Sequence, residues 1–212
     1  MSCNHHPAVE SLLQHASGKT SGLQHLMIRL HCKVCDHCDK VVTEFESLGG
    51  ETLESLSDTP LQVGAFQALM KRIQSNADVT EVDSNRSDYA HLIEKILGRE
   101  GKADKLNWHW RTKRFAEIPL PTEDKGFDAK LIYFKKGMKV PRHTHRDKEY
   151  TLVLSGAFSD DSGEYKRGDY VYKTSHDEHS PVATSDCICL AVTTQPLKFT
   201  GTFGPVLNWF LN

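Results

Sequence analysis

Residues 137–156 read GMKVPRHTHRDKEYTLVLSG, and this stretch decides the fold of the second half of the chain. His143 and His145 are two residues apart, so on a β-strand both imidazoles project from the same face. Glu149 is an even number of residues from both histidines, so on a continuous strand its carboxylate projects from the same face. The glycine at each end of the stretch suits a turn. Mixed nitrogen and oxygen donors suit zinc, iron, manganese, nickel or copper. The stretch therefore predicts a strand-borne site for a divalent transition metal, whose identity the spacing leaves open.

The same spacing, G-x5-H-x-H-x3-E-x6-G, resembles the first sequence motif of the cupin family at every fixed position. The second cupin motif, G-x5-P-x-G-x2-H-x3-N, is matched at Gly168 and His179. Thr174, His176 and Ala183 replace its proline, glycine and asparagine. The resemblance implies a β-barrel in which the two histidines and the glutamate of the first motif bind the metal together with His179. His176 is a rival for the fourth position.

Other segments of the second half alternate with a period of two and are separated by glycines, which is typical of a β-sandwich or barrel. The expected strands are Lys130–Phe134, Glu149–Ser155, Asp169–Tyr172, Ile188–Thr193 and Val206–Leu211.

The first hundred residues follow a period of 3.6 instead, which predicts helices. The apolar stripes begin at Val9, Leu23, Val41, Val63 and Tyr89. The pair Gly49-Gly50 is expected to end the third helix, and the polar segments 49–60 and 74–87 are expected to be loops.

The two patterns therefore predict an α+β protein with two domains. We expect an all-α helical bundle with structural zinc over residues 1–98, a linker over 99–105 and an all-β cupin barrel or sandwich over 106–212. A helical domain of this size buries little apolar area, so a partner protein is expected to cover some of its stripes.

Cysteine and histidine are abundant in this chain, at 6 and 12 residues, and many of them lie near the N-terminus. If the compartment is reducing, such a cluster indicates metal before disulfides. On one helix, His31, Cys35 and Cys38 would point within about 60° of one another. A tetrahedral zinc ion then needs one more ligand, for which His5 and His6 are the candidates.

Other nearby groups compete for this site. Cys3 could replace the N-terminal histidine, while Cys32 and His37 would point away from the shared face. The C-x-x-C pair also permits redox pairing, above all without metal. In the second half, Cys187 and Cys189 would share one face of a strand, either as small core residues or beside the metal.

The H-x3-C-x2-C spacing, with a histidine near the N-terminus, resembles the zinc-binding anti-sigma domain of bacteria. That resemblance implies that His6, His31, Cys35 and Cys38 hold zinc. It also implies that the helices wrap around an extracytoplasmic-function sigma factor and cover the surfaces with which that factor binds core RNA polymerase.

The two halves together resemble the ChrR-like family of anti-sigma factors. This resemblance implies that the second domain releases the sigma factor in response to singlet oxygen or related oxidants, with an oxidant or small molecule acting at the barrel metal. The alternative is a cupin metalloenzyme, a dioxygenase or an isomerase, with a zinc-stabilised helical appendage. The helical half favours the regulator, because a simple cupin enzyme would not carry it.

Charge and hydropathy exclude other classes of function. The formal net charge is -2 and no run of Lys or Arg exceeds two residues, which argues against direct nucleic-acid binding. No stretch approaches the roughly 18 apolar residues of a membrane span. The N-terminal residues MSCNHHPAVE do not resemble a secretion signal, so we expect a cytoplasmic protein.

Overall fold

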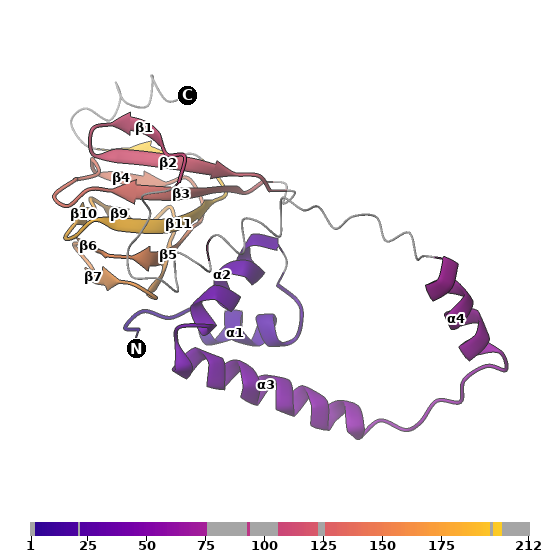
Figure 1. Ribbon diagram of the computed structural model, residues 1–212. Helices are drawn as coiled ribbons and strands as arrows, with labels where there is room; N and C mark the ends of the chain where they lie inside the picture. The colour runs from indigo at the N-terminus through magenta and orange to yellow at the C-terminus, as the bar shows by residue number, and fades with distance from the viewer. Residues whose placement is uncertain are drawn as a thin grey trace.

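A computed structural model describes residues 3–20, 22–75, 93, 106–122, 126–195 and 197–200 (Figure 1). Its helices are α1 (Val9–Ala16), α2 (Gly22–Cys32), α3 (Asp36–Glu54) and α4 (Ala65–Ser75). The helix expected from Tyr89 lies outside the described residues apart from Ile93, which is helical and buried. The expected linker over 99–105 and the expected strand over 206–211 also lie outside them.

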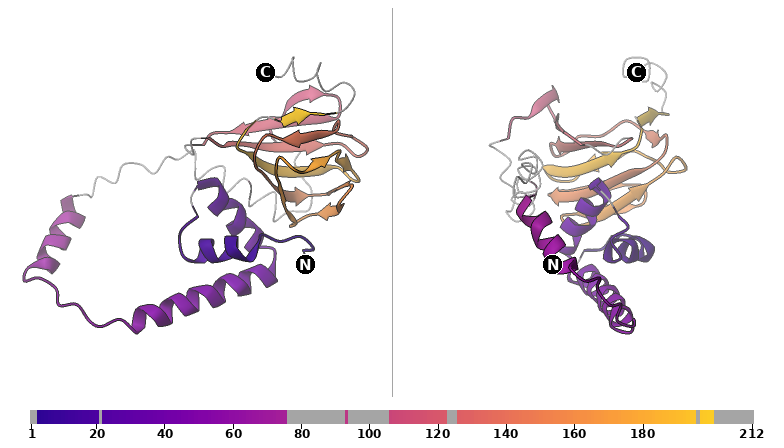
Figure 2. Two further views of the ribbon diagram at one scale, coloured as in Figure 1. Left: turned by 180° about the vertical axis from the view of Figure 1, so that it is seen from behind. Right: turned by 90° about the vertical axis from the view of Figure 1, so that its right-hand side faces the viewer.

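The first three helices form a small bundle in which α2 is the central element. Its buried side chains include Leu23, Met27, Ile28 and Leu30, so that more than one face of this helix is covered. Figures 1 and 2 show α2 nearest to the β-domain, with α1 and α3 on its other side. This arrangement confirms the prediction that the first part of the chain is helical.

The third helix is longer than the sequence pattern predicts. Gly49 and Gly50 were expected to end it, yet α3 runs through both to Glu54, so this expectation and the loop predicted from residue 49 are wrong there. Neither glycine has a positive φ, and an added Cβ would meet nothing within 4 Å at either position. A glycine within a helix costs only about 1 kcal/mol, which a helix of 19 residues tolerates.

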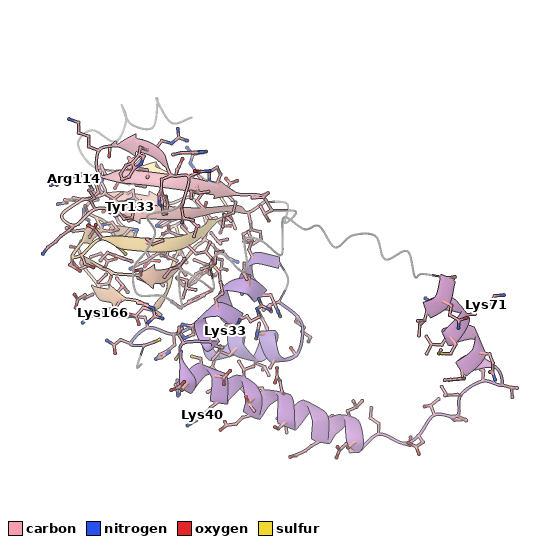
Figure 3. The ribbon with its side chains drawn as sticks, viewed as in Figure 1. Lys33, Lys40, Lys71, Arg114, Tyr133 and Lys166 are labelled. Carbon is pink, nitrogen blue, oxygen red and sulfur yellow. The ribbon has the colours of Figure 1, made fainter. Side chains whose placement is uncertain are left out.

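The fourth helix lies apart from the other described parts of the chain. Phe66, Leu69, Met70 and Ile73 repeat at helical spacing along one face, and all four are exposed. Figure 3 shows the side chains of α4, Lys71 among them, away from both the bundle and the β-domain. This helix therefore has an apolar face that no described part of the chain covers.

In the second half, the described strands lie in three sheets. The largest has six strands in the order β1-β2-β3-β11-β5-β8, and two three-stranded sheets have the orders β10-β6-β7 and β12-β4-β9. The strands are β1 (His109–Thr112), β2 (Phe115–Leu120), β3 (Asp128–Phe134), β4 (His143–His145), β5 (Glu149–Ser155), β6 (Ala157–Asp160), β7 (Gly163–Lys166), β8 (Tyr170–Lys173), β9 (Glu178–His179), β10 (Val182–Ala183), β11 (Cys187–Thr193) and β12 (Leu197–Phe199).

Strand pairing brings distant residues of the two cupin motifs together. In the antiparallel pair β4–β9, His143 lies directly opposite His179. In the pair β5–β8, Glu149 lies opposite Lys173. The sheets therefore place both motifs around one interior position.

The helical bundle and the β-domain share one apolar core. Met27 and Leu30 of α2 belong to the same buried cluster as Leu152 and Leu154 of β5 and Tyr170 of β8. No helix among the described residues has the length and apolar character needed to cross a membrane.

Candidate metal centres

Three histidines converge inside the β-domain. The ligand atoms of His143, His145 and His179 all lie within 4.8 Å of one another, and the three residues are buried. The Nε2 atoms of His145 and His179 are 3.1 Å apart. An Oε2 atom of Glu149 lies 3.0 Å from Nε2 of His145, so the carboxylate lies beside the histidines but outside the group whose atoms are all within 4.8 Å of one another. The structure thus brings the three histidines of the cupin motifs together and places the glutamate next to one of them.

Hydrogen bonds outside this cluster set which nitrogen carries the proton in two of the three rings, His143 and His179. The Nδ1–H group of His143 donates to the carbonyl of Pro141 at 2.9 Å, and that of His179 donates to Asp160 at 2.9 Å. The Nε2 atoms of both neutral rings therefore keep lone pairs for the cluster. Burial lowers the pKa of His143 to about 4, and it also lowers the pKa of His179. Neutral rings with converging lone pairs suit a metal cation.

The carboxylate adds negative charge to this position. Burial by itself would raise the pKa of Glu149, but the hydrogen bond with His145 and the nearby histidines outweigh it and hold the pKa below its ordinary value. Nitrogen and oxygen ligands about 2.1 Å from a metal, at right angles to one another, are about 3.0 Å apart. The observed separations of 3.0 and 3.1 Å match this value. The three histidines, with Glu149 beside His145, therefore suit a divalent transition metal.

A carboxylate that no sequence motif indicates supports this cluster. Asp160, at the end of β6, is the acceptor for His179, and its side chain is fully buried. Lys173 forms an ion pair with the same carboxylate at 3.4 Å. Asp160 lies outside both cupin motifs, and only the pairing of strands brings it to His179.

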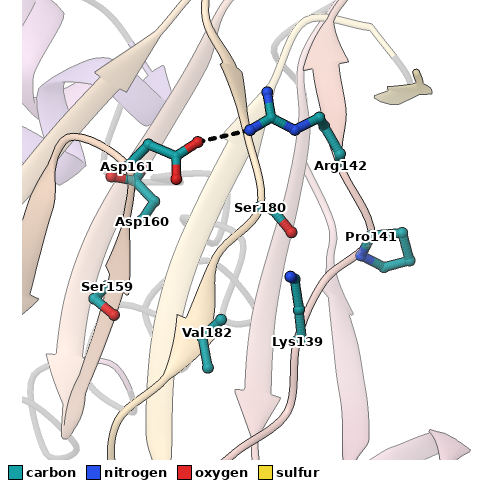
Figure 4. A pocket seen from close by; sticks show the side chains of 8 residues that line it. All are labelled: Lys139, Pro141, Arg142, Ser159, Asp160, Asp161, Ser180 and Val182. Carbon is teal, nitrogen blue, oxygen red and sulfur yellow. Dashed lines mark hydrogen bonds and ion pairs between the residues drawn. The ribbon is translucent and has the colours of Figure 1, made fainter. Parts of the chain in front are cut away.

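A surface pocket of about 390 Å³ lies over this support (Figure 4). Asp160 lines it together with Lys139, Arg142 and Asp161. Arg142 pairs with Asp161 at 2.8 Å and with Glu178 at 3.1 Å. Two acidic and two basic residues therefore line the pocket.

The two cysteines of β11 lie in the interior of the β-domain. Cys187 and Cys189 are buried in one cluster with Val153, and their sulfur atoms are 3.6 Å apart. A hydrogen bond with Cys187, burial and the nearby Glu149 raise the pKa of Cys189 well above its ordinary value. Both thiols therefore share one face of the strand, as predicted, and both are core residues, with Cys189 near Glu149.

The second cluster lies at the N-terminal end of the chain. The ligand atoms of His6, His31, Cys35 and Cys38 all lie within 4.8 Å of one another. One expectation about them is wrong, because the last three do not share a single helix. Helix α2 ends at Cys32, and α3 begins at Asp36 with Cys35 as its N-cap. The turn between the helices brings these side chains together.

The distances in this cluster suit a tetrahedral metal site. Nδ1 of His6 lies 3.4 Å from the sulfur atoms of both Cys35 and Cys38, and Nε2 of His31 lies 3.3 Å from that of Cys38. Tetrahedral zinc with ordinary bond lengths would place nitrogen and sulfur about 3.6 Å apart. Burial and the neighbouring thiols raise the pKa of Cys38, so a cation is needed to hold it as a thiolate. The donor set therefore fits zinc.

The remaining candidate ligands take other positions. The ring of His5 faces Asp169 at 3.3 Å, so His6 is the N-terminal histidine that joins the cluster. Cys32 is half-buried and His37 is exposed, and neither belongs to it. In the β-domain the rival residue His176 is exposed, and His179 takes the position beside His143 and His145.

Comparison with known proteins places the β-domain in a defined class. Residues 102–198 match the family described as the ChrR cupin-like domain. The barrel is therefore a cupin domain of this kind.

A relative matches almost the whole chain. The anti-sigma-E factor ChrR of Cereibacter sphaeroides (strain ATCC 17023) is 31% identical over 205 residues, which cover 94% of this chain and 93% of the relative. A crystal structure of Rhodobacter sphaeroides SigE in complex with the anti-sigma ChrR matches with a TM-score of 0.69 and 29% identity. That match covers 90% of this chain and 98% of the other. The chain belongs to the ChrR family.

Proposed function

We propose that this protein is an anti-sigma factor that binds and inhibits an extracytoplasmic-function sigma factor. Membership of the ChrR family supports the proposal, since the matched relative is an anti-sigma factor and the matched structure is a complex with SigE. The match extends over the helical half, so the family favours a regulator over a cupin metalloenzyme. We also propose that the protein acts in the cytoplasm, where sigma factors meet RNA polymerase.

The observation that carries the proposal is the uncovered apolar face of α4. Phe66 is 67% exposed, Leu69 53% and Ile73 56%, although their spacing is that of a buried helix face. Full burial of one such side chain contributes roughly 1.5–3 kcal/mol. Covering this face with a partner would therefore stabilise a complex by several kcal/mol, which suits a clamp that closes on another protein.

The N-terminal cluster gives this clamp a fixed base. We propose that its metal is zinc, since two thiolates and two imidazoles form a closed structural set. The ion would join the N-terminal segment to α2 and α3, and it would add stability to a bundle with a small core. For the barrel we propose zinc or another divalent transition metal, because three imidazoles and a carboxylate suit several ions.

We further propose that the barrel is the sensor that releases the sigma factor under oxidative stress, with singlet oxygen or a related oxidant as the signal. The buried histidine–carboxylate cluster supports this role, and so does the core that the barrel shares with α2. A change of coordination in the barrel can alter sigma binding only if it stabilises the bound and released forms differently.

A charge placed on the apolar face of α4 tests the proposed function. Leu69→Asp should weaken binding to the cognate sigma factor at least 30-fold, because an interface that buries a leucine would then bury an unpaired charge. Gln67→Asp is the matched control. It adds the same charge to an exposed position of the same helix, about 110° from the centre of the apolar face.

The measurement is co-purification of the two proteins, followed by titration of the sigma factor into each purified variant. Equal affinity of Leu69→Asp and Gln67→Asp would show that α4 does not contact the sigma factor. Absence of binding by the wild-type chain would reject the proposed function itself.

A further inference from the structure

We propose that the turn of residues 167–170, which we call the clamp turn, completes the N-terminal zinc site, so that the affinity of this site for zinc depends on the docked barrel. The inference rests on the proposed zinc site of the helical half. It concerns residues that lie in the barrel and are not themselves ligands.

The clamp turn holds the segment that carries His6. An Oδ1 atom of Asp169 accepts hydrogen bonds from the backbone N–H groups of Asn4 at 2.7 Å and His5 at 3.1 Å. The backbone N–H of Tyr170 donates to the carbonyl of His5 at 3.0 Å. Three hydrogen bonds from the barrel therefore fix the two residues that precede the ligand.

The same turn orients a second ligand. The Nδ1–H group of His31 donates to the carbonyl of Gly168 at 2.7 Å, and this bond leaves the Nε2 lone pair facing Cys38. Such a partner fixes the tautomer and the orientation of a metal-binding histidine. Its acceptor here is a backbone atom of the barrel, more than a hundred residues further along the chain.

Close packing explains why the turn has a glycine at this point. Gly168 has a φ of +94°, and a Cβ there would lie 2.8 Å from the sulfur of Cys3 and 3.2 Å from the side chain of Val34. Both of these neighbours belong to the helical half. The backbone of the turn therefore packs against both the N-terminal segment and the connection between α2 and α3, which carry the residues of the zinc cluster.

The carboxylate of the clamp turn is buried and fully used. Its side chain is 2% exposed, and its Oδ2 atom accepts from the backbone N–H of Lys166 at 2.8 Å and faces Nδ1 of His5 at 3.3 Å. Burial would raise the pKa of Asp169, but the backbone hydrogen bonds hold it below its ordinary value. The buried carboxylate is stabilised by hydrogen bonds from the N-terminal segment, and undocking of the two halves would break those bonds.

Docking and zinc binding therefore support each other. If the docked barrel strengthens zinc binding by some factor, then bound zinc strengthens docking by the same factor. The strand that follows the clamp turn, β8, ends at Lys173, which pairs with Asp160 and so with the barrel ligand His179. One strand thus has the zinc site at one end and the barrel cluster at the other.

Asp169→Asn in the full chain tests the inference. An amide has one oxygen, so its NH2 group must face either the N–H groups of the N-terminal segment or that of Lys166, and one set of hydrogen bonds is lost. The matched control is Asp186→Asn, whose carboxylate likewise accepts from a backbone N–H, that of Lys136 at 2.8 Å, and from Tyr133 at 2.8 Å. Its partners all lie in the barrel.

A second variant excludes a fault in the barrel fold. Asn4→Pro removes one backbone donor to Asp169 from the N-terminal side and leaves the barrel sequence unchanged. Each protein is titrated with cobalt(II), whose charge-transfer absorption with thiolates reports this site alone, and zinc is then added in competition.

We expect the zinc affinity to fall at least tenfold in Asp169→Asn and at least threefold in Asn4→Pro, and to change less than twofold in the control. Alkylation of Cys35 and Cys38 in the zinc-loaded protein should accelerate in the same order. Wild-type affinity in either folded variant would overturn the inference. A wild-type chain that shows no thiolate-bound metal would reject the proposed zinc site as well, which separates the two failures.

Discussion

The carboxylate of Asp160 supports His179, and we expect its removal to weaken metal binding at the barrel cluster. Both of its oxygens are used: Oδ1 accepts from the backbone N–H of Ser162 at 2.8 Å, and Oδ2 accepts from His179 at 2.9 Å and pairs with Lys173. In Asp160→Asn only one oxygen remains. Either the bond from Ser162 is lost, or an NH2 group faces the His179 ring and the ammonium of Lys173.

The second arrangement changes the state of the ligand. An NH2 group opposite Nδ1 of His179 favours the tautomer whose proton is on Nε2, and Nε2 then has no lone pair for the metal. Loss of a supporting hydrogen bond of this kind typically lowers metal affinity 10- to 100-fold, or by about 1.4–2.7 kcal/mol. The side chain of Asp160 is itself shielded from solvent, so we expect a loss within this range.

The control for this change is Asp161→Asn, one residue further along the chain. That side chain is 69% exposed and pairs with Arg142 at the surface, so we expect a change of less than twofold. Both proteins are equilibrated with buffered cobalt(II), and total bound cobalt is measured by mass spectrometry. The thiolate charge-transfer absorption gives the share at the N-terminal site, and the difference gives the barrel site. A folded Asp160→Asn protein whose barrel binds cobalt as tightly as Asp161→Asn would refute the reasoning.

Two other perturbations have clear expected outcomes. Glu149→Ala should block release of the sigma factor by singlet oxygen and leave binding of the sigma factor unchanged, because the barrel cluster would lose its carboxylate. Pull-down of the sigma factor before and after photosensitised oxidation measures binding and release. Undiminished release would show that this cluster is not the sensor. Gly156→Ala should destabilise the protein by about 3 kcal/mol or more in chemical denaturation, because the residue has a φ of +71° and a Cβ would overlap the carbonyl oxygen of Asp186 at 1.9 Å. Gly126→Ala, which has a φ of +89° but no atom within 4 Å of its Cβ, should lose only about 1–2 kcal/mol, and equal losses in the two variants would rule out the overlap.

Local pattern was a good guide wherever a property depends on neighbouring residues. The period of 3.6 predicted the helices at the start of the chain, and the period of two predicted β3, β5 and β11 closely. The error at Gly49-Gly50 has the same local origin. Two glycines lower the helix propensity of a segment, but that preference is weak beside the continuity of a long helix.

Convergence of side chains depended on the turn and the strand pairing instead. The approach of His31 to Cys35 and Cys38 comes from the change of direction between α2 and α3, which a single-helix projection does not contain. The contact of Asp160 with His179 requires strands from separate hairpins, and neither the residue types nor their spacing in the sequence predicts it.

The sequence by itself indicated the two groups of candidate metal ligands and the class of each half, because short stretches of chain carry the donor atoms and the alternation of side chains. Only the tertiary structure decided what surrounds those donors. Asp160 supports His179, and the carbonyl of Gly168 orients His31, because packing brought a buried acceptor within hydrogen-bond distance of each ring. The partnership between the barrel and the N-terminal cluster follows from that packing, since a hydrogen bond depends on distance in space and not on separation along the chain.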